Sequence, residues 1–124
     1  MPLGNRGLFF NIYLTTPYQW HIIPMMNIKA QLIRRDKNVD ELGNTIEFKM
    51  WQLSKPSDDK PHGYKYSLVY IVAGKRVIGY DNAEGKGDHR HYGEKESPYR
   101  FRSLNQVAKD FLNDMERYKR GEEL

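Results

Sequence analysis

The segment spanning residues 79–93 concentrates side chains that could do chemistry. It places carboxylates, imidazoles and basic groups close together: Asp81, Asp88, His89, His91, Lys86 and Arg90. Imidazoles titrate near neutral pH and can act as general acids and bases. Glycine lets a backbone approach a ligand and adopt positive φ, so we expect the glycines of this segment to shape it: Gly79, Gly85, Gly87 and Gly93.

His89 and His91 are two residues apart in this segment. In an extended chain this spacing places both imidazoles on one face and Arg90 on the other. One imidazole could take the proton of an RNA 2′-hydroxyl while the other donates a proton to the leaving oxygen. We expect Asp81 or Asp88 to orient an imidazole. We also expect four side chains to contact phosphate or RNA: Lys86, Arg90, Arg100 and Asn82.

Two other interpretations of this segment remain open. We predict no metal or other cofactor, but Asp81, His89 and His91 could together ligate a divalent metal. The segment could also be a solvated hairpin loop in which the histidines only cap turns. Two of the four histidines fall within three residues, beside glycines and a strand-end aspartate, and this concentration favours a functional loop.

Length and composition narrow the class of protein. The chain has 124 residues, of which 39% are hydrophobic and 13% aromatic, and this fits a single globular domain. It has no cysteine, which excludes disulfides, thiolate zinc sites, iron–sulfur clusters and cysteine nucleophiles. No stretch approaches the roughly 18 apolar residues of a membrane span, and we expect a cytoplasmic protein. The net charge of +4 permits a nucleic-acid partner without establishing one.

The elements that must position these side chains are mainly strands. Period-two patterns predict short strands over residues 27–35, 45–53, 64–73, 76–82 and 99–102. Gly74 and Lys75 suit a two-residue type II′ turn, and residues 83–98 have the composition of an irregular stretch. The lone Gly79 inside a strand indicates a bulge or the close approach of another group.

A C-terminal helix completes the predicted fold. Ser103 and Gln106 form a capping-box pattern at its start, and Gly121 suits its end. Its apolar face, with Phe111 at the centre, consists of Leu104, Val107, Ala108, Phe111, Leu112, Met115 and Tyr118. Strand aromatics are expected to pack rather than to stack on bases: Tyr64, Tyr66, Tyr70 and Trp51. We therefore predict an α+β domain, an antiparallel sheet of four or five strands with the C-terminal helix packed on one face.

Residues 1–26 differ in character from the rest of the chain. They contain three prolines, Arg6 as their one charged side chain, and no steady period. They could form an apolar arm that covers a sheet edge or makes an oligomer contact. We favour the other interpretation, a natural start at Met25 or Met26, which puts the arm outside the working domain. That domain then spans residues 27–120 and is followed by a tail at 121–124.

Several blocks of the chain, in order and without large gaps, resemble the TumE family. They are residues 65–70, 74–82, 85–91 and 98–101 and the helix that follows. The resemblance covers roughly residues 28–118 and is most specific from Tyr80 to Gly93. TumE proteins are small toxins of prokaryotic toxin–antitoxin pairs. The resemblance therefore implies a toxin that is encoded beside a helix-turn-helix antitoxin and neutralised by binding it. It supplies no mechanism and leaves the oligomeric state open.

The leading interpretation combines the resemblance with the histidine pair. It is a ribonuclease-like toxin that cleaves RNA without metal, with His89 and His91 as acid and base. A non-catalytic module that binds nucleic acid or antitoxin is the first alternative. A metal-dependent nuclease or nucleotide-modifying enzyme is the second. Geometry separates them, because imidazoles and a carboxylate that converge on one point favour chemistry, whereas side chains that splay outward favour binding.

Overall fold

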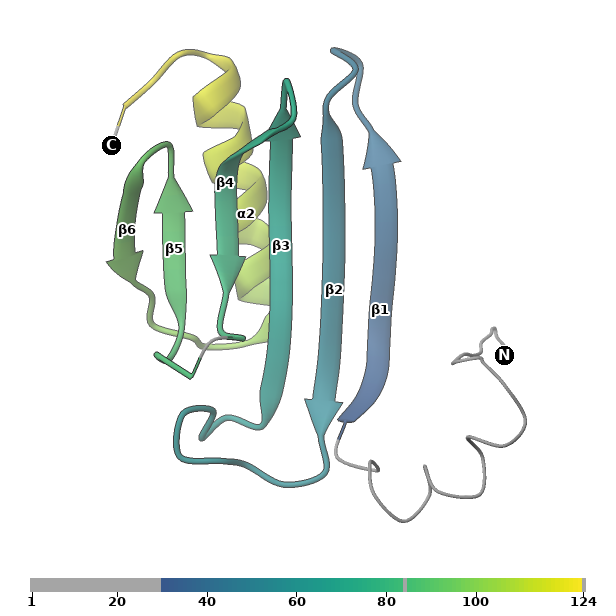
Figure 1. Cartoon of the computed structure of the whole chain (residues 1–124), viewed down its shortest axis with the longest axis vertical. Helices are drawn as coiled ribbons and strands as arrows, with labels where there is room; N and C mark the ends of the chain where they lie inside the picture. The colour runs from purple at the N-terminus through teal and green to yellow at the C-terminus, as the bar shows by residue number, and fades with distance from the viewer. Residues whose placement is uncertain (1–29, 84, 124) are drawn as a thin grey trace, which may run out of the picture.

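The structure, a computed structural model, describes residues 30–83 and 85–123. It contains one antiparallel sheet in the order β1-β2-β3-β4-β5-β6 and one helix, α2 (Figure 1). The strands are β1 Ala30–Val39, β2 Thr45–Leu53, β3 Tyr64–Val72, β4 Lys75–Asp81, β5 His89–Tyr92 and β6 Lys95–Pro98, and α2 is Leu104–Lys119. The α+β class and the C-terminal helix on an antiparallel sheet are confirmed, but the sheet has six strands rather than four or five.

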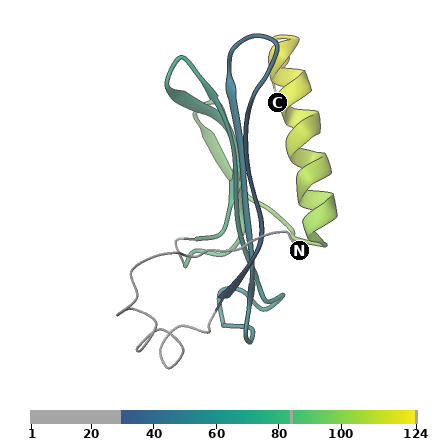
Figure 2. The ribbon, with the colours of Figure 1, turned by 90° about the vertical axis from the view of Figure 1, so that its right-hand side faces the viewer.

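The helix covers one face of the sheet, and the core lies between these two layers (Figure 2). Strand alternation supplies the inward side chains, and those of β2 and β3 are Phe48, Met50, Tyr66, Leu68 and Tyr70, all buried. Phe111 of α2 is fully buried and meets the Phe48 ring edge-to-face, with the ring centroids 5.3 Å apart. We call the opposite face of the sheet, which carries Lys49, Ser67 and Asp81, the open face.

Only one of the two hydrogen bonds of a capping box forms at the start of α2. Ser103 Oγ accepts a hydrogen bond from the Gln106 backbone nitrogen at 3.0 Å, as the capping-box pattern predicts. The Gln106 side chain instead donates to Asp110 Oδ1, at 2.9 Å. Leu112 was assigned to the apolar face but is 43% exposed. No helix in the described residues is long and apolar enough to span a membrane.

The segment predicted to be irregular forms a hairpin, β5 and β6. Tyr92 pairs with Lys95 across Gly93 and Glu94, and Gly93 has a φ of 62°. The pattern hides this hairpin because it has few apolar side chains and its strands are held by backbone pairing. The strand expected over residues 99–102 is absent: after β6 the chain passes directly to the helix, and the Tyr99 nitrogen donates to the Asp88 carbonyl at 2.9 Å.

The β3–β4 hairpin differs from the prediction in its turn and contains a bulge. The turn residues are Ala73 and Gly74, with φ values of 52° and 75°, rather than Gly74 and Lys75. Two positive φ values define a type I′ turn, not type II′. Farther along, Tyr70 pairs with Ile78 and Ile71 with Arg76, so Val77 is an extra residue in β4. The predicted arm at residues 1–26 lies outside the described residues.

Candidate active site

Strand pairing brings Asp81, His89 and His91 together on the open face. Asp81 at the end of β4 pairs with His89, and Gly79 pairs with His91. Because alternate residues of a strand share a face, both histidines lie beside the aspartate, away from α2. This confirms the prediction, made from the spacing of two, that the imidazoles share one face.

The three side chains converge on one point. His89 Nε2 lies 2.8 Å from Asp81 Oδ1, and His91 Nε2 lies 3.6 Å from Asp81 Oδ2. The two imidazole rings meet edge-to-face with their centroids 5.1 Å apart. The side chains of His89, His91 and Asp81 are 6%, 13% and 15% exposed, respectively. The cluster is therefore shielded from bulk water, which strengthens electrostatic interactions within it.

The second ring nitrogen of His89 contacts the preceding loop. Nδ1 lies 3.1 Å from the carbonyl oxygen of Gly87, which can only accept a hydrogen bond, so Nδ1 carries a hydrogen. Gly87 has a φ of 84°, in the region that favours glycine, and this fits its predicted role in shaping the loop. Gly85 also has a positive φ. Both nitrogens of His89 thus face oxygen acceptors, an arrangement that suits a proton-donating imidazole.

Arg76 is a site residue that the sequence did not indicate. The bulge at Val77 reverses the alternation of β4, so Arg76 lies on the open face with Gly79 and Asp81. Its Nη2 is 3.0 Å from His91 Nδ1, and its Nη1 is 3.9 Å from Asp81 Oδ2. Arginine can only donate, so His91 Nδ1 is an acceptor and a neutral His91 carries its hydrogen on Nε2.

The surroundings of His91 favour its neutral form. Burial lowers the pKa of His91, and the neighbouring Arg76 guanidinium lowers it further, against the opposing effect of Asp81. A neutral imidazole with an available lone pair is what a general base requires.

Gly79 provides the space that the Arg76 side chain needs. A Cβ atom at Gly79 would lie 2.9 Å from Arg76 Cδ and 3.6 Å from His91 Cδ2. The sequence indicated a bulge or a close approach at this glycine; the structure has the close approach there, and the bulge lies two residues earlier, at Val77.

Two further charged side chains border the cluster. Glu96 Oε2 lies 3.5 Å from His89 Nε2 and 3.9 Å from His91 Nε2. Glu96 was missed because β6 was not predicted. The predicted phosphate ligand Lys86 is exposed, and its Nζ is 3.4 Å from Glu96 Oε2, so Lys86 lies beside the site. The cluster therefore holds carboxylates, imidazoles and cations within a few ångströms.

The alternative metal-ligand set also lies together in the structure. The ligand atoms of Asp81, His89 and His91 are all within 4.8 Å of one another, and nitrogen and oxygen donors of this kind suit a divalent ion. The Arg76 contact opposes this use, because an Nδ1 that accepts from arginine leaves the hydrogen of a neutral His91 on Nε2, the atom that faces Asp81. The observed arrangement thus fits acid/base chemistry better than ligation.

The structure does not bring Asp88 to the histidine pair. Asp88 Oδ2 accepts from the buried Tyr66 hydroxyl at 2.6 Å and lies 2.9 Å from His62 Nε2. The other nitrogen of His62 accepts from the Tyr64 backbone, so Nε2 donates to Asp88. Burial and this carboxylate raise the pKa of Tyr66. Asp88 therefore orients an imidazole, as predicted for one of the two aspartates, but the imidazole is that of His62.

Asn82 was predicted to contact phosphate or RNA, but its side chain faces the backbone of β3. Its side chain is fully buried. Its Oδ1 accepts from the Tyr66 backbone nitrogen at 3.1 Å, and its Nδ2 donates to the Tyr64 carbonyl at 2.9 Å. The amide thus extends the backbone pairing of β3 beyond the end of β4, and Asn82 has a structural role.

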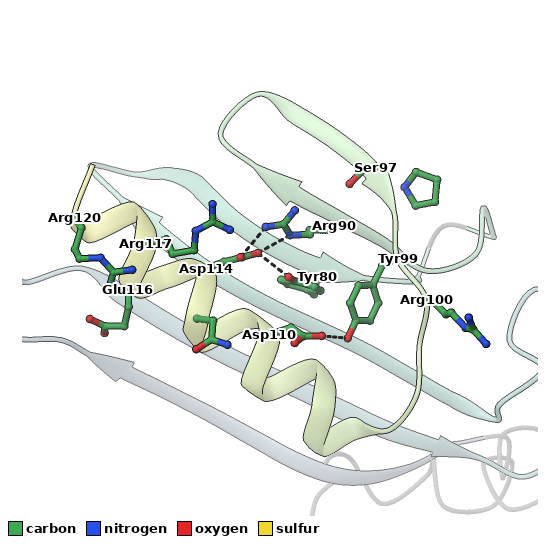
Figure 3. A pocket seen from close by; sticks show the side chains of 12 residues that line it. Tyr80, Arg90, Ser97, Tyr99, Arg100, Asp110, Asp114, Glu116, Arg117 and Arg120 are labelled. Atoms are coloured by element: carbon green, nitrogen blue, oxygen red, sulfur yellow. Dashed lines mark hydrogen bonds and ion pairs between the residues drawn. The ribbon is translucent and has the colours of Figure 1, made fainter. Parts of the chain in front are cut away.

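Arg90 and Arg100 lie beside α2, with Tyr80 and Asp114 (Figure 3). Arg90 makes a bidentate pair with Asp114 of α2, at 2.6 and 2.7 Å. The same carboxylate accepts from the Tyr80 hydroxyl at 2.6 Å, so Arg90 belongs to an internal network. Both arginines line a cleft of about 590 Å³ between α2 and the β5–β6 hairpin. Arg90 is therefore engaged with Asp114 rather than with the histidine pair.

Together, fold and site define a small α+β protein with an aspartate–histidine–histidine–arginine cluster on the sheet face opposite α2. The model of the family Toxin TumE matches residues 28–119, so the chain belongs to the TumE toxin family. This confirms the resemblance drawn from the sequence. No curated protein and no solved structure matches the chain.

Proposed function

We propose that this TumE-family toxin cleaves RNA by acid/base catalysis at the cluster of Asp81, His89 and His91. The observation that supports this most is the convergence of both imidazoles on one carboxylate, with Nε2 atoms 2.8 and 3.6 Å from its oxygens. Side chains of a merely basic docking loop would splay outward. A pair of imidazoles on one surface can serve the two proton transfers that phosphodiester cleavage needs.

His91 is the general base in this proposal, and Arg76 is its partner. The neutral ring holds its lone pair on Nδ1, where Arg76 Nη2 covers it at 3.0 Å. An arriving phosphate competes for the guanidinium, whose side chain is 43% exposed. Arg76 then binds the phosphate, and Nδ1 of His91 becomes available to accept the 2′-hydroxyl proton.

His89 is the general acid. Its Nδ1 donates to the Gly87 carbonyl, and its Nε2 lies 2.8 Å from Asp81 Oδ1, so the ring lies between a carbonyl and a carboxylate. The attacking 2′-oxygen forms a bond to phosphorus, and the bond from phosphorus to the 5′-oxygen breaks. The 2′-hydroxyl proton goes to His91, and a proton from His89 goes to the 5′-oxygen. The products are a 2′,3′-cyclic phosphate and a 5′-hydroxyl, with no other reactant consumed.

The same ligand atoms favour a metal-dependent nuclease as the second candidate, since they lie within 4.8 Å of one another. A chelator separates the two. Metal-independent chemistry keeps its full rate in excess chelator, whereas a metal enzyme loses activity and regains it when a divalent ion is added back.

Alanine substitution of each histidine tests the proposal. Purified wild-type, His89→Ala and His91→Ala proteins at equal folded concentration are incubated with mixed cellular RNA. Loss of one positioned acid or base should slow cleavage by about 10²–10⁴-fold. Lys109→Ala, which removes an exposed charge on α2, is the matched control and should cleave normally. Full cleavage by both histidine variants overturns the proposal.

The family also indicates an antitoxin partner, and we propose that it is a helix-turn-helix protein that acts in the same cytoplasm. The adjacent reading frame tests this directly. Co-expression of that frame should restore growth to cells that express the toxin, and an adjacent frame without a helix-turn-helix would contradict the partner type.

A further inference from the structure

The open face continues from the site across β3, β2 and β1 as a row of paired residues. Asp81 pairs with both His89 and Ser67, Ser67 with Lys49, and Lys49 with Arg35. Neighbouring strands lie about 4.8 Å apart, so four strand steps extend this row over about 19 Å. In the described part of the chain no helix or strand lies over this face (Figure 2).

The part of this face on β1 to β3 is basic. Its cations are Arg35, Lys37, Lys49 and Lys65, and its one carboxylate is Glu47, which lies 3.8 Å from Lys49 Nζ. An anionic ligand whose reacting group lies at His89 and His91 would extend over these cations. Charge complementarity therefore favours an anionic partner over a basic or apolar one.

Trp51 adds an aromatic surface beside the basic row. It pairs with Leu32 on one side and Lys65 on the other, on the open face and away from the core. The Lys65 ammonium lies 5.1 Å from the centroid of the indole ring, and the Trp51 side chain is only half-buried. Trp51 was expected to be a packing residue, but no core aromatic stacks on it among the ring pairs of the described residues. An indole ring can stack on a base, and a lysine beside it can bind the phosphate of the same nucleotide.

We propose that the open face of β1 to β3 is a track for single-stranded RNA, with Trp51 and Lys65 as a base-stacking platform and Lys49 and Arg35 as phosphate contacts. This proposal rests on the proposed function, because it assigns the substrate of the same site to a single strand that runs across the sheet. A track of this length binds an oligonucleotide of several residues more tightly than a dinucleotide.

Binding is measured with a labelled 2′-O-methyl oligoribonucleotide, which lacks the attacking hydroxyl and is not cleaved. Trp51→Leu keeps apolar bulk and should weaken binding by about 5- to 150-fold, the range equivalent to one lost stacking contact. Lys65→Gln should weaken it as well. Lys49→Gln should lower the slope of log affinity against log salt by about 1. Lys109→Gln, on α2, is the control and should leave both affinity and slope unchanged.

Fluorescence provides a second test that keeps Trp51 in place and so does not depend on the folding of a Trp51 variant. The chain has two tryptophans, so Trp20→Phe leaves Trp51 as the single fluorophore. Its emission should be quenched by the oligonucleotide and not by an abasic strand of equal length. Equal quenching by both strands, no quenching at all, or an equal loss of binding in Lys49→Gln and Lys109→Gln overturns the track. So does preferential binding of a duplex.

These outcomes separate the track from the catalytic proposal. If Trp51→Leu and Lys65→Gln bind normally while the histidine variants lose cleavage, the track is wrong and the catalytic site stands. If they lose binding while the histidine variants cleave normally, the track stands and the catalytic assignment is wrong.

Discussion

The side chain of Arg76 lies against Gly79 of the same strand, β4, and a Cβ atom at Gly79 would lie only 2.9 Å from Arg76 Cδ. The bulge at Val77 aims the arginine at this face, and the missing side chain lets it reach His91 and Asp81. A strand residue without a side chain usually weakens a sheet, so this glycine is a local cost that positions a cation at the site.

Gly79→Ala should therefore lower RNA cleavage without unfolding the protein. The new methyl group displaces Arg76, and the rate should fall to that of Arg76→Ala. Alanine has the better strand propensity, so the melting temperature should stay within a few degrees. The double variant should be no slower than either single variant, because both act through the same side chain. Additive losses, or full activity in Gly79→Ala, would show that Gly79 does not act through Arg76.

Phe111→Ala should remove much of the stability of the domain. The ring is fully buried against Phe48, and loss of such a ring costs about 3–5 kcal/mol of unfolding free energy. Leu112→Ala is the matched control. Leu112 follows Phe111 on α2 but is 43% exposed, so its loss should change the free energy of unfolding by about 0.5 kcal/mol or less. Urea denaturation of both variants measures the difference. Similar urea midpoints for the two variants would show that Phe111 is not at the centre of the helix–sheet core.

Acid should destabilise the fold through Asp40. Asp40 Oδ2 accepts from the Tyr70 hydroxyl at 2.6 Å, and this bond, more than the backbone bonds and Lys119, lowers the pKa of Asp40 to about 2. An unfolded aspartate titrates near 3.9, so the stabilising contribution is complete above about pH 4 and is lost as the pH falls towards 2.

Asp40→Asn tests this pH dependence by thermal unfolding between pH 2 and 6. The variant should have a lower melting temperature than the wild type at pH 6, and this difference should shrink as the pH falls towards 2. Asp58→Asn, in the exposed loop between β2 and β3, serves as the control. A gap of constant size across the range would contradict the role of Asp40.

Residues 1–25 should be dispensable for folding. They precede the family match, which starts at residue 28, and they show no steady strand or helix period. Deletion should leave the melting temperature within a few degrees, equivalent to about 1 kcal/mol. A collapse in soluble yield would show that these residues belong to the folded domain.

Much of the site follows from local spacing in the sequence. His89 and His91 share a face because β5 is extended, and the strand-end Asp81 joins them because β4 and β5 pair in that register. The same alternation explains why Asp88 and Arg90, which flank His89 in the sequence, contact partners away from the histidine cluster. Residues that are adjacent in the sequence therefore need not share a face of the sheet.

The rest of the site depends on features that leave little trace in a single sequence. The bulge that turns Arg76 towards the histidines is a register shift between two strands, and only pairing reveals it. Glu96 lies beside the histidines because of the β5–β6 hairpin, whose polar strands show no apolar period. The helix core was largely predictable, except that the buried Asp114 interrupts the apolar face to pair with Arg90.

The chemistry of the cut ends tests the central claim most directly. Purified toxin is incubated with RNA in excess chelator, and the termini of the products are identified by mass spectrometry. Acid/base cleavage by His89 and His91 predicts 2′,3′-cyclic phosphate ends, or the 3′-phosphates formed by their hydrolysis, together with 5′-hydroxyl ends. It also predicts that a single 2′-deoxy substitution blocks cleavage at that position. Products with 3′-hydroxyl and 5′-phosphate ends, or no cleavage until a divalent ion is restored, would contradict the claim.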